Sequence, residues 1–268
     1  MESKLILGDC SEKLKEIDSG SVNLTITSPP YDNLRTYDNS LDWSFDVFKK
    51  VADELYRVTC EGGVVIWVVG DATINGSETL SSFKQAIYFN QIGFNVHDTM
   101  LYKKINHLPL TQNRYEQDFE YMFCFSKGRP NVFTPIRIAC KYAGTVPWGA
   151  SSVFKTPDER VLVEMDVIKD TKIHGNIFEY RTGSTENDGF DHPAPFPKGL
   201  VEDQMNTWSN EGDVVLDPFM GSGTTGIVCA ELNRNFIGIE KVPEYFNGAE
   251  HRVLQSMELH KYRKTHLF

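Results

Sequence analysis

The chain has 268 residues, with 27 Lys and Arg against 37 Asp and Glu, so its formal net charge is −10. Hydrophobic residues make up 40% and charged residues 24%, a globular composition that excludes a collagen, a coiled coil or a wholly disordered chain. The acidic balance gives no overall attraction to nucleic acid or to an anionic membrane, so DNA binding would need a local basic patch.

Strand and helix patterns alternate along most of the chain. Such alternation predicts a mostly parallel sheet with helices on both faces. The runs of β-branched and aromatic residues that predict strands are Leu5–Leu7, Val22–Thr27, Val64–Val69, Phe94–Lys103, Phe119–Ser126, Val214–Leu216 and Asn235–Glu240. The predicted helices are Ser11–Ile17, Ser44–Thr59, Thr79–Ile92, Lys198–Trp208, Thr224–Leu232 and Glu244–Leu259.

Two parts of the chain depart from this alternation. Only a loop separates the strands at 94–103 and 119–126, which predicts an antiparallel pair at a sheet edge. Residues 129–191 are rich in Gly, Pro, Thr and Asp and contain no long amphipathic helix, so we expect a small insertion there.

The cysteines and the N-terminus indicate a reducing compartment. The start of the chain has no signal-peptide pattern, and no apolar run approaches the ~18 residues that a membrane-spanning helix needs. The cysteines are scattered and form no CxxC pair, which argues against a disulfide framework, a zinc ribbon or another metal site. We therefore expect a cytoplasmic protein without a membrane partner. The cysteines are Cys10, Cys60, Cys124, Cys140 and Cys229.

The first chemically suggestive segment is 27–31, which follows a predicted strand and reads Thr-Ser-Pro-Pro-Tyr. Pro29 and Pro30 remove two N–H donors and hold the residues before them extended, so the loop is rigid. The Ser28 hydroxyl and the free carbonyls would project at the carboxyl edge of the sheet, where open α/β sheets bind ligands. Tyr31 adds a flat aromatic face. The alternative is a proline turn whose tyrosine packs in the core.

The second segment joins a predicted strand to a predicted helix. It reads Asp217-Pro218-Phe219-Met220-Gly221-Ser222-Gly223-Thr224-Thr225. Its glycines let the backbone approach a ligand closely, and the N–H groups at the helix start would face that ligand. The lysine of a Walker A loop is missing, which disfavours a nucleoside triphosphate. Glu240 ends the next strand, at the position where dinucleotide folds place an acid that binds a ribose diol. The alternative is a glycine-rich turn beside an exposed glutamate.

A further carboxylate, Asp9, follows the first predicted strand. It could accept a hydrogen bond from the exocyclic amine of a nucleoside ligand. The alternative is an N-cap for the short helix that begins near Ser11.

Together these segments resemble the DNA amino-methyltransferases, which methylate an exocyclic nitrogen of a base with S-adenosylmethionine. Residues 28–31 resemble the catalytic motif of these enzymes, residues 217–225 the cofactor loop, and Glu240 the acid that binds the ribose. The catalytic motif precedes the cofactor loop, which resembles the β-class arrangement, a circular permutation of the usual chain. Residues 192–197 resemble the segment that leads into the helix before the cofactor strand, and residues 119–127 a late strand of the family.

This resemblance implies an α/β, Rossmann-like methyltransferase fold. Its seven-stranded, mostly parallel sheet would have one antiparallel edge pair, and the chain would be circularly permuted. The catalytic domain would comprise residues 1–128 and 192–268, and the insertion at 129–191 would serve target recognition. The resemblance assigns to the S-adenosylmethionine site Asp9, Cys10, Phe196, Asp217, Pro218, Phe219, Gly221, Ser222, Gly223, Thr224, Glu240 and Lys241.

The motif also bears on the target base. Ser28 resembles the cytosine-N4 subgroup, because adenine-N6 enzymes mostly have Asp or Asn there, and Phe196 stands where many adenine enzymes have Lys. The resemblance implies that Ser28, Pro29, Pro30 and Tyr31 act on a base flipped out of the duplex, by direct displacement. No Cys follows a Pro, which disfavours cytosine-C5 chemistry. Adenine-N6 methylation, protein glutamine methylation and a non-catalytic DNA-binding subunit stay open as alternatives.

Contact with DNA needs positive charge despite the acidic total. Between residues 103 and 141, seven basic residues stand against three acidic ones, which favours phosphate contacts there over a merely solvated face. The expected partner is double-stranded DNA with a specific recognition sequence, in a restriction-modification or epigenetic role in a prokaryote or phage. A homodimer and a cognate restriction endonuclease are partners that the sequence leaves open. The predicted DNA-binding residues are Lys103, Lys104, Arg114, Arg129, Arg137 and Lys141.

Overall fold

The computed structural model describes residues 2–30, 43–106, 114–146, 151–156, 159–163, 166–182 and 196–266. The chain forms two compact units: Met1–Thr134 together with Asn176–Phe268, and Pro135–Gly175. Within the described residues, the first unit contains the main sheet and the helices, and the second consists of paired strands joined by turns and loops.

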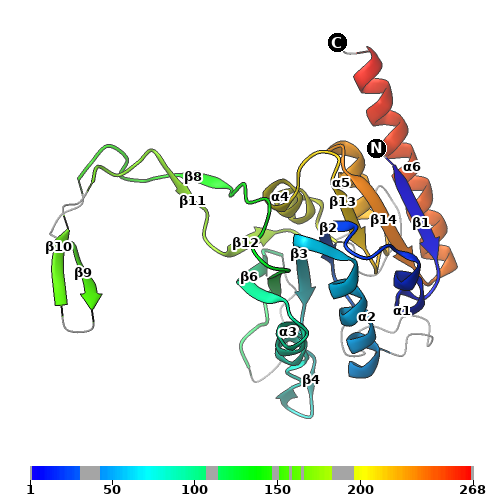
Figure 1. Cartoon of the computed structure of the whole chain (residues 1–268), viewed down its shortest axis with the longest axis horizontal. Helices are drawn as coiled ribbons and strands as arrows, with labels where there is room; N and C mark the ends of the chain where they lie inside the picture. The colour runs from blue at the N-terminus through cyan, green and yellow to red at the C-terminus, as the bar shows by residue number, and fades with distance from the viewer. Residues whose placement is uncertain are drawn as a thin grey trace. The chain divides into compact units, whose positions relative to one another are not determined.

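An eight-stranded sheet runs through the first unit in the order β1-β14-β13-β2-β3-β7-β6-β12 (Figure 1). All of its strands run in one direction except β7, which is antiparallel to both β3 and β6. The predicted mostly parallel α/β sheet is thus confirmed. The strands are β1 Ser3–Leu7, β2 Val22–Thr27, β3 Thr59–Val69, β6 Asn95–Lys104, β7 Phe119–Ser126, β12 Ile177–Tyr180, β13 Val214–Asp217 and β14 Asn235–Glu240.

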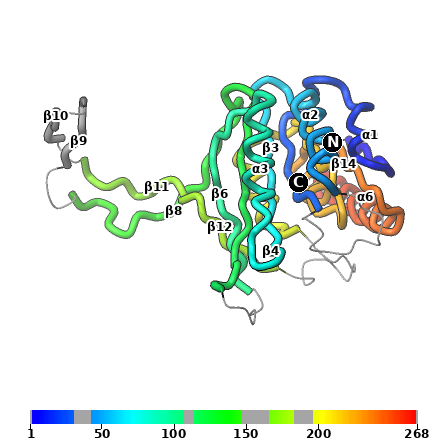
Figure 2. The backbone as a smooth tube through the Cα atoms, turned by 90° about the horizontal axis from the view of Figure 1, so that it is seen from below, coloured from blue at the N-terminus to red at the C-terminus, as the bar shows by residue number. Residues whose placement is uncertain are grey.

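The edge of this sheet corrects the prediction in one respect. The antiparallel pair of β6 and β7 is not the edge, because β12 continues the sheet beyond β6 and pairs with it in parallel (Figure 2). The sheet therefore has one strand more than the seven predicted. Only Phe178 and Tyr180 of β12 pack against the core, so this four-residue strand carries too short a pattern to be recognised in the sequence.

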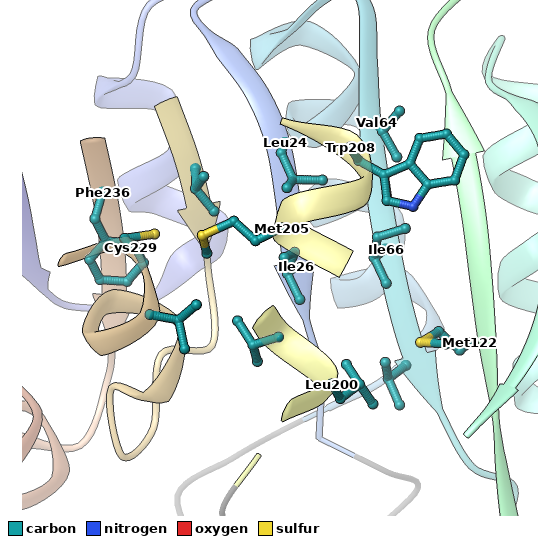
Figure 3. Packing of buried hydrophobic residues seen from close by; sticks show 14 of the residues in the cluster. Leu24, Ile26, Val64, Ile66, Met122, Leu200, Met205, Trp208, Cys229 and Phe236 are labelled. Atoms are coloured by element: carbon teal, nitrogen blue, oxygen red, sulfur yellow. The ribbon is translucent and has the colours of Figure 1, made fainter. Parts of the chain in front are cut away.

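Helices cover both faces of the sheet and enclose two apolar clusters. Figure 3 shows Leu200, Met205 and Trp208 of α4 packed against the strand residues Ile26 and Ile66. The helices of this face are α4 Lys198–Trp208, α5 Thr224–Glu231 and α6 Pro243–His266. The other face is covered by α1 Cys10–Lys13, the following 3₁₀ turn Leu14–Glu16, α2 Phe45–Val58 and α3 Ser81–Gln91.

The helices follow from local sequence signals. At the start of α2 the Ser44 hydroxyl accepts a hydrogen bond from the Val47 N–H at 3.3 Å, which caps the first turn. Apolar side chains at helical spacing then bury one face of α2 against the sheet. Helix α6 is longer than predicted, because it continues through the basic residues at 261–264 to His266. In the stretches that the structure describes, no helix combines the length and apolar character needed to cross a bilayer.

The remaining strands are short. β4 (Thr73–Ile74) and β5 (Ser77–Glu78) form a small hairpin after β3. In the second unit β8 (Arg137–Ala139) pairs with β11 (Thr171–Ile173), and β9 (Ser151–Thr156) with β10 (Glu159–Val163). This unit lies within the predicted insertion at 129–191, while residues 129–134 and 176–182 belong to the first unit.

Candidate functional site

The ends of neighbouring parallel strands bring the two chemically suggestive segments together. β1, β14, β13, β2 and β3 are consecutive and parallel, so their carboxyl ends lie at one edge of the sheet. Ser28 directly follows β2, and the glycine loop directly follows Asp217, the last residue of the neighbouring strand β13. The segments at 27–30 and 217–225 therefore occupy adjacent positions on the edge where such sheets bind ligands.

The buried Asp217 carboxylate links these two segments directly. Its Oδ1 accepts a hydrogen bond from the Thr27 hydroxyl at 2.7 Å, although 190 positions separate the two residues. Its Oδ2 accepts one from the Thr225 hydroxyl at 2.7 Å, and the Phe219 N–H donates to Oδ1 at 3.1 Å. Burial raises the pKa of Asp217 to about 6, although these three donors favour the ionised form.

The glycine loop has the backbone geometry that its residues predict. Gly221 and Gly223 have φ values of 51° and 80°, in the left-handed region that glycine tolerates best. A Cβ on Gly223 would lie 3.0 Å from the Cβ of Ala249 on α6, so the loop and that helix are in close contact. Arg252 of α6 donates a hydrogen bond from Nη1 to the Ser222 carbonyl, and α5 begins at Thr224.

Glu240 lies at the carboxyl end of β14, beside this loop. Its Oε2 accepts a hydrogen bond from the Gly221 N–H at 2.9 Å, and its Oε1 accepts one from the Val242 N–H at 2.8 Å. Burial raises the pKa of Glu240, and these backbone donors oppose the rise. Each oxygen keeps a second lone pair, so a carboxylate fixed in this way suits the hydroxyls of a ribose diol.

Asp9 has the helix-capping role that was its alternative. Its Oδ1 accepts hydrogen bonds from the Ser11 N–H at 2.9 Å and from the Ser11 hydroxyl at 2.7 Å, which caps α1. Its Oδ2 forms an ion pair with the Lys241 ammonium at 3.0 Å. Burial acts to raise the pKa of Asp9, but Ser11 and Lys241 outweigh it and hold the pKa below its usual value. The Cys10 side chain is buried in the apolar cluster on the α2 side of the sheet.

The catalytic-loop candidates are described in part. Pro29 is buried, and Ser28 and Pro30 are half-buried at the end of β2. Tyr31 lies outside the described residues. The described residues continue from Trp43, whose ring packs edge-on against the half-buried Phe219 ring with centroids 5.2 Å apart.

The other cofactor candidates lie in the glycine loop or pack against the core of the sheet. Pro218, Ser222 and Thr224 are buried in the glycine loop, where the Ser222 and Thr224 hydroxyls lie 3.2 Å apart. Phe196 is half-buried against the core cluster on the α4 side of the sheet.

The predicted DNA-binding residues are divided between the two units. Arg137 and Lys141 belong to the second unit, and the other four belong to the first. Lys103 pairs with Glu179 at 3.0 Å, and Lys104 pairs with Glu120 at 2.5 Å.

The remaining basic side chains have local contacts or are exposed. Arg114 donates hydrogen bonds to Thr73 Oγ1 and to the Gly76 carbonyl. In the second unit Arg137 binds Thr171, and the Lys141 ammonium lies over the Tyr142 ring. Arg129 is exposed.

Sequence reasoning missed several residues that organise the site. Thr27 and Thr225 carry the hydrogen bonds to Asp217, and Arg252 holds the Ser222 carbonyl. Asp71, buried after β3, accepts a hydrogen bond from the Ser82 N–H at 2.9 Å and holds the start of α3 at the same edge. Thr27 and Thr225 are the end residues of the two segments that the sequence singles out, and that position was the only available signal. Nothing in the local sequence distinguishes Asp71 or Arg252 from other polar residues.

Comparison with known proteins places this geometry in a family. The model of the N6/N4 DNA methylase family matches residues 22–251. The chain is 44% identical over 261 residues to the orphan methyltransferase M.BamHII of Bacillus amyloliquefaciens, covering 95% of this chain and 93% of that protein. It is 31% identical over 282 residues to the type II methyltransferase M.MjaI of Methanocaldococcus jannaschii, covering 88% of this chain and 86% of that protein.

Solved structures share the fold. The cytosine-N4-specific PvuII DNA methyltransferase superposes with a TM-score of 0.67 at 18% identity, covering 97% of this chain and 92% of that one. TTHA0409 of Thermus thermophilus, complexed with S-adenosyl-L-methionine, superposes with a TM-score of 0.63 at 22% identity, covering 96% of both chains. The expected Rossmann-like methyltransferase fold is confirmed. The chain belongs to the β-class of the N6/N4 family of DNA methyltransferases, which use S-adenosylmethionine as the methyl donor.

Proposed function

We propose that this DNA methyltransferase acts on the exocyclic N4 amine of cytosine. The observation that carries the proposal is the Asp217 carboxylate, which accepts hydrogen bonds of 2.7 Å from Thr27, the residue before Ser28, and from Thr225, at the end of the cofactor loop. A methyl donor seated on that loop and an amine held by Ser28 would lie next to each other at one sheet edge. Serine at position 28 and phenylalanine at position 196 favour cytosine over adenine by resemblance to the cytosine-N4 subgroup.

The residues around the glycine loop fit the cofactor. Glu240 would accept hydrogen bonds from the ribose hydroxyls, and the loop at 221–223 would approach the cofactor with its backbone. Asp9 and Lys241 lie at the ends of β1 and β14, where they would bound the adenine end. Bound S-adenosylmethionine supplies a methyl group that is activated by its attachment to a sulfonium.

Ser28 and Pro29 have the chemistry to activate the target amine. The lone pair of this amine is delocalised into the cytosine ring, so the amine is a poor nucleophile. Two acceptors, the Ser28 hydroxyl oxygen and the Pro29 carbonyl oxygen, would draw the NH₂ group towards a tetrahedral geometry and free the lone pair. The protein then contributes mainly orientation, and the proton lost after transfer leaves through Ser28 to water.

The target base has to leave the duplex to reach this edge. Tyr31 follows the two prolines and would stack on the extruded cytosine, a contact worth ~1–3 kcal/mol. The exposed Arg129 and the basic residues of the second unit, Arg137 and Lys141, are the candidate phosphate contacts. We propose target recognition as the role of the insertion at 129–191.

The names of two relatives bear on the cellular role that we propose for this enzyme. M.BamHII is an orphan methyltransferase, and M.MjaI is a type II methyltransferase. A cytoplasmic enzyme that modifies a specific DNA sequence, with or without a partner endonuclease, agrees with both. A homodimer is a further proposal, which light scattering of the purified protein tests.

One experiment tests the proposed base. Unmethylated DNA is incubated with the protein and with S-adenosylmethionine carrying an isotopically labelled methyl group, then digested to nucleosides and analysed by mass spectrometry. Labelled N4-methylcytosine is expected. Labelled N6-methyladenine would replace the cytosine proposal with the adenine alternative. Cofactor binding without label in either nucleoside would favour a non-catalytic DNA-binding subunit. Protein carrying Ser28→Ala serves as the control for contaminating activity.

A further inference from the structure

The buried bridge at Asp217 lies where the sheet ladder between the two motif-bearing strands has ended. β2 and β13 are paired at Leu24 with Val215 and at Thr25 with Leu216, and no later pair follows. Thr27 lies two residues beyond this last pair. The hydrogen bond from its hydroxyl to Asp217 is therefore the link that fastens the end of β2 to the cofactor strand.

The same strand provides a contrasting residue. Thr25 and Thr27 are both fully buried and lie two positions apart, so their side chains lie on the same face of the sheet. Among the residues that the structure describes, the Thr25 hydroxyl has no hydrogen-bond partner, whereas the Thr27 hydroxyl donates to a carboxylate. Burial alone therefore does not account for the Thr27 contact.

We propose that Thr27 is a positioning residue, which sets the place of Ser28 relative to the cofactor loop through Asp217. The inference rests on the proposed function and adds to it the coupling between the two loops. Thr27 is bonded to Ser28 in the chain, and Asp217 also holds Thr225, the second residue of α5, so one carboxylate fixes both halves of the site. A displacement of about 1 Å at a reacting group can lower turnover by ~10²-fold.

The charge of Asp217 gives the coupling a pH signature. Among the described residues, Glu240 on β14 and the Cys229 thiol on α5 are titratable groups that interact electrostatically with this carboxylate. Loss of the Thr27 donor removes a hydrogen bond to the ionised form, so the pKa of Asp217 would rise further. If turnover requires the ionised Asp217 carboxylate, the acid limb of the kcat profile would then lie at higher pH.

The test compares three variants of β2 in steady-state methyl transfer across pH. Thr27→Val is expected to lower kcat roughly 10- to 100-fold, leave the KM for S-adenosylmethionine near its wild-type value, and move the acid limb of the kcat profile to higher pH. Thr27→Ser keeps the hydroxyl, so kcat and the position of the acid limb should both return to near their wild-type values. Thr25→Val, with the same change of side chain on the same strand, should match the wild type. If Thr27→Val does not fold, Thr225→Val tests the other end of the bridge with the same readouts.

Several outcomes overturn the inference. The Thr27 hydroxyl does not position the site if kcat falls equally in Thr27→Val and Thr25→Val. The same conclusion follows if the acid limb of the kcat profile does not move in Thr27→Val, or if Thr27→Ser does not recover kcat. These outcomes are distinct from failure of the proposed function, which appears in the wild type. A wild type that methylates adenine overturns the proposed base and leaves the Thr27 comparison intact, whereas a wild type that methylates no base overturns both.

Discussion

Replacing Lys104 by methionine would separate two roles that this residue could have. The charge pattern of the sequence predicts that Lys104 contacts DNA phosphates, but the structure pairs its ammonium with the Glu120 carboxylate at 2.5 Å. The Lys104 and Glu120 side chains are 23% and 10% exposed, so the pair is largely removed from water. The neighbouring Lys103 pairs with Glu179 at 3.0 Å, and those side chains are 42% and 56% exposed. Lys103→Met is therefore a matched control.

The expected loss of stability follows from these exposures. Removing one partner of a buried ion pair costs ~3–5 kcal/mol, because the other charge stays buried without its partner. Partial exposure of Lys104 lets water reach the site, so the lower limit of about 3 kcal/mol applies to Lys104→Met. This corresponds to a fall in Tm of about 6–12 °C for a chain of this size. Lys103→Met, in a pair that water screens, should leave the stability close to that of the wild type.

Urea unfolding followed by tryptophan fluorescence measures the two stability losses, and fluorescence anisotropy measures DNA affinity against salt. Combining Lys104→Met with Glu120→Gln should recover much of the loss, because the second change removes the buried carboxylate charge that the Lys104 ammonium balances. The slope of log affinity against log salt should stay unchanged in Lys104→Met. Equal stability losses in the two lysine variants, or a slope reduced by about 0.9 in Lys104→Met alone, would refute the reasoning.

Four further changes test the site. Ser28→Ala should lower kcat by roughly 10²-fold or more with little change in the calorimetric Kd for S-adenosylmethionine, and an unchanged kcat would remove Ser28 from catalysis. Tyr31→Ala should raise the KM for DNA, since a stacking contact of ~1–3 kcal/mol is lost; unaltered kinetics would end the stacking proposal. Gly223→Ala should weaken cofactor binding, because its φ of 80° and the nearby Ala249 disfavour a side chain; wild-type calorimetry would contradict this. Arg129→Gln should reduce the salt slope of DNA binding by about 0.9, and an identical slope would exclude a phosphate contact.

The sequence by itself determined most of the sheet and the order of its motifs. The core strands are patterned over several residues each, so β2 and β14 were predicted with the bounds that the structure has. Proline and glycine restrict or widen the conformations of their own backbone. A rigid loop at residues 29–30 and a tight turn at residues 221–223 could therefore be inferred without knowing the fold. The family resemblance and the cofactor could be inferred from the same local motifs.

Only the tertiary structure decided which of these residues act on each other. The contact of Thr27 with Asp217 depends on two distant strands lying side by side, and no local pattern specifies this partner. The same holds for Lys104 with Glu120, where cross-strand placement gives a predicted DNA contact an intramolecular partner. β12 pairs with β6 in the folded protein, and its four residues, three of which favour strands, are too few to identify it from the sequence. Local propensity acts over a few residues, whereas strand register and burial are set by the whole chain, so these pairings could be seen only in the folded protein.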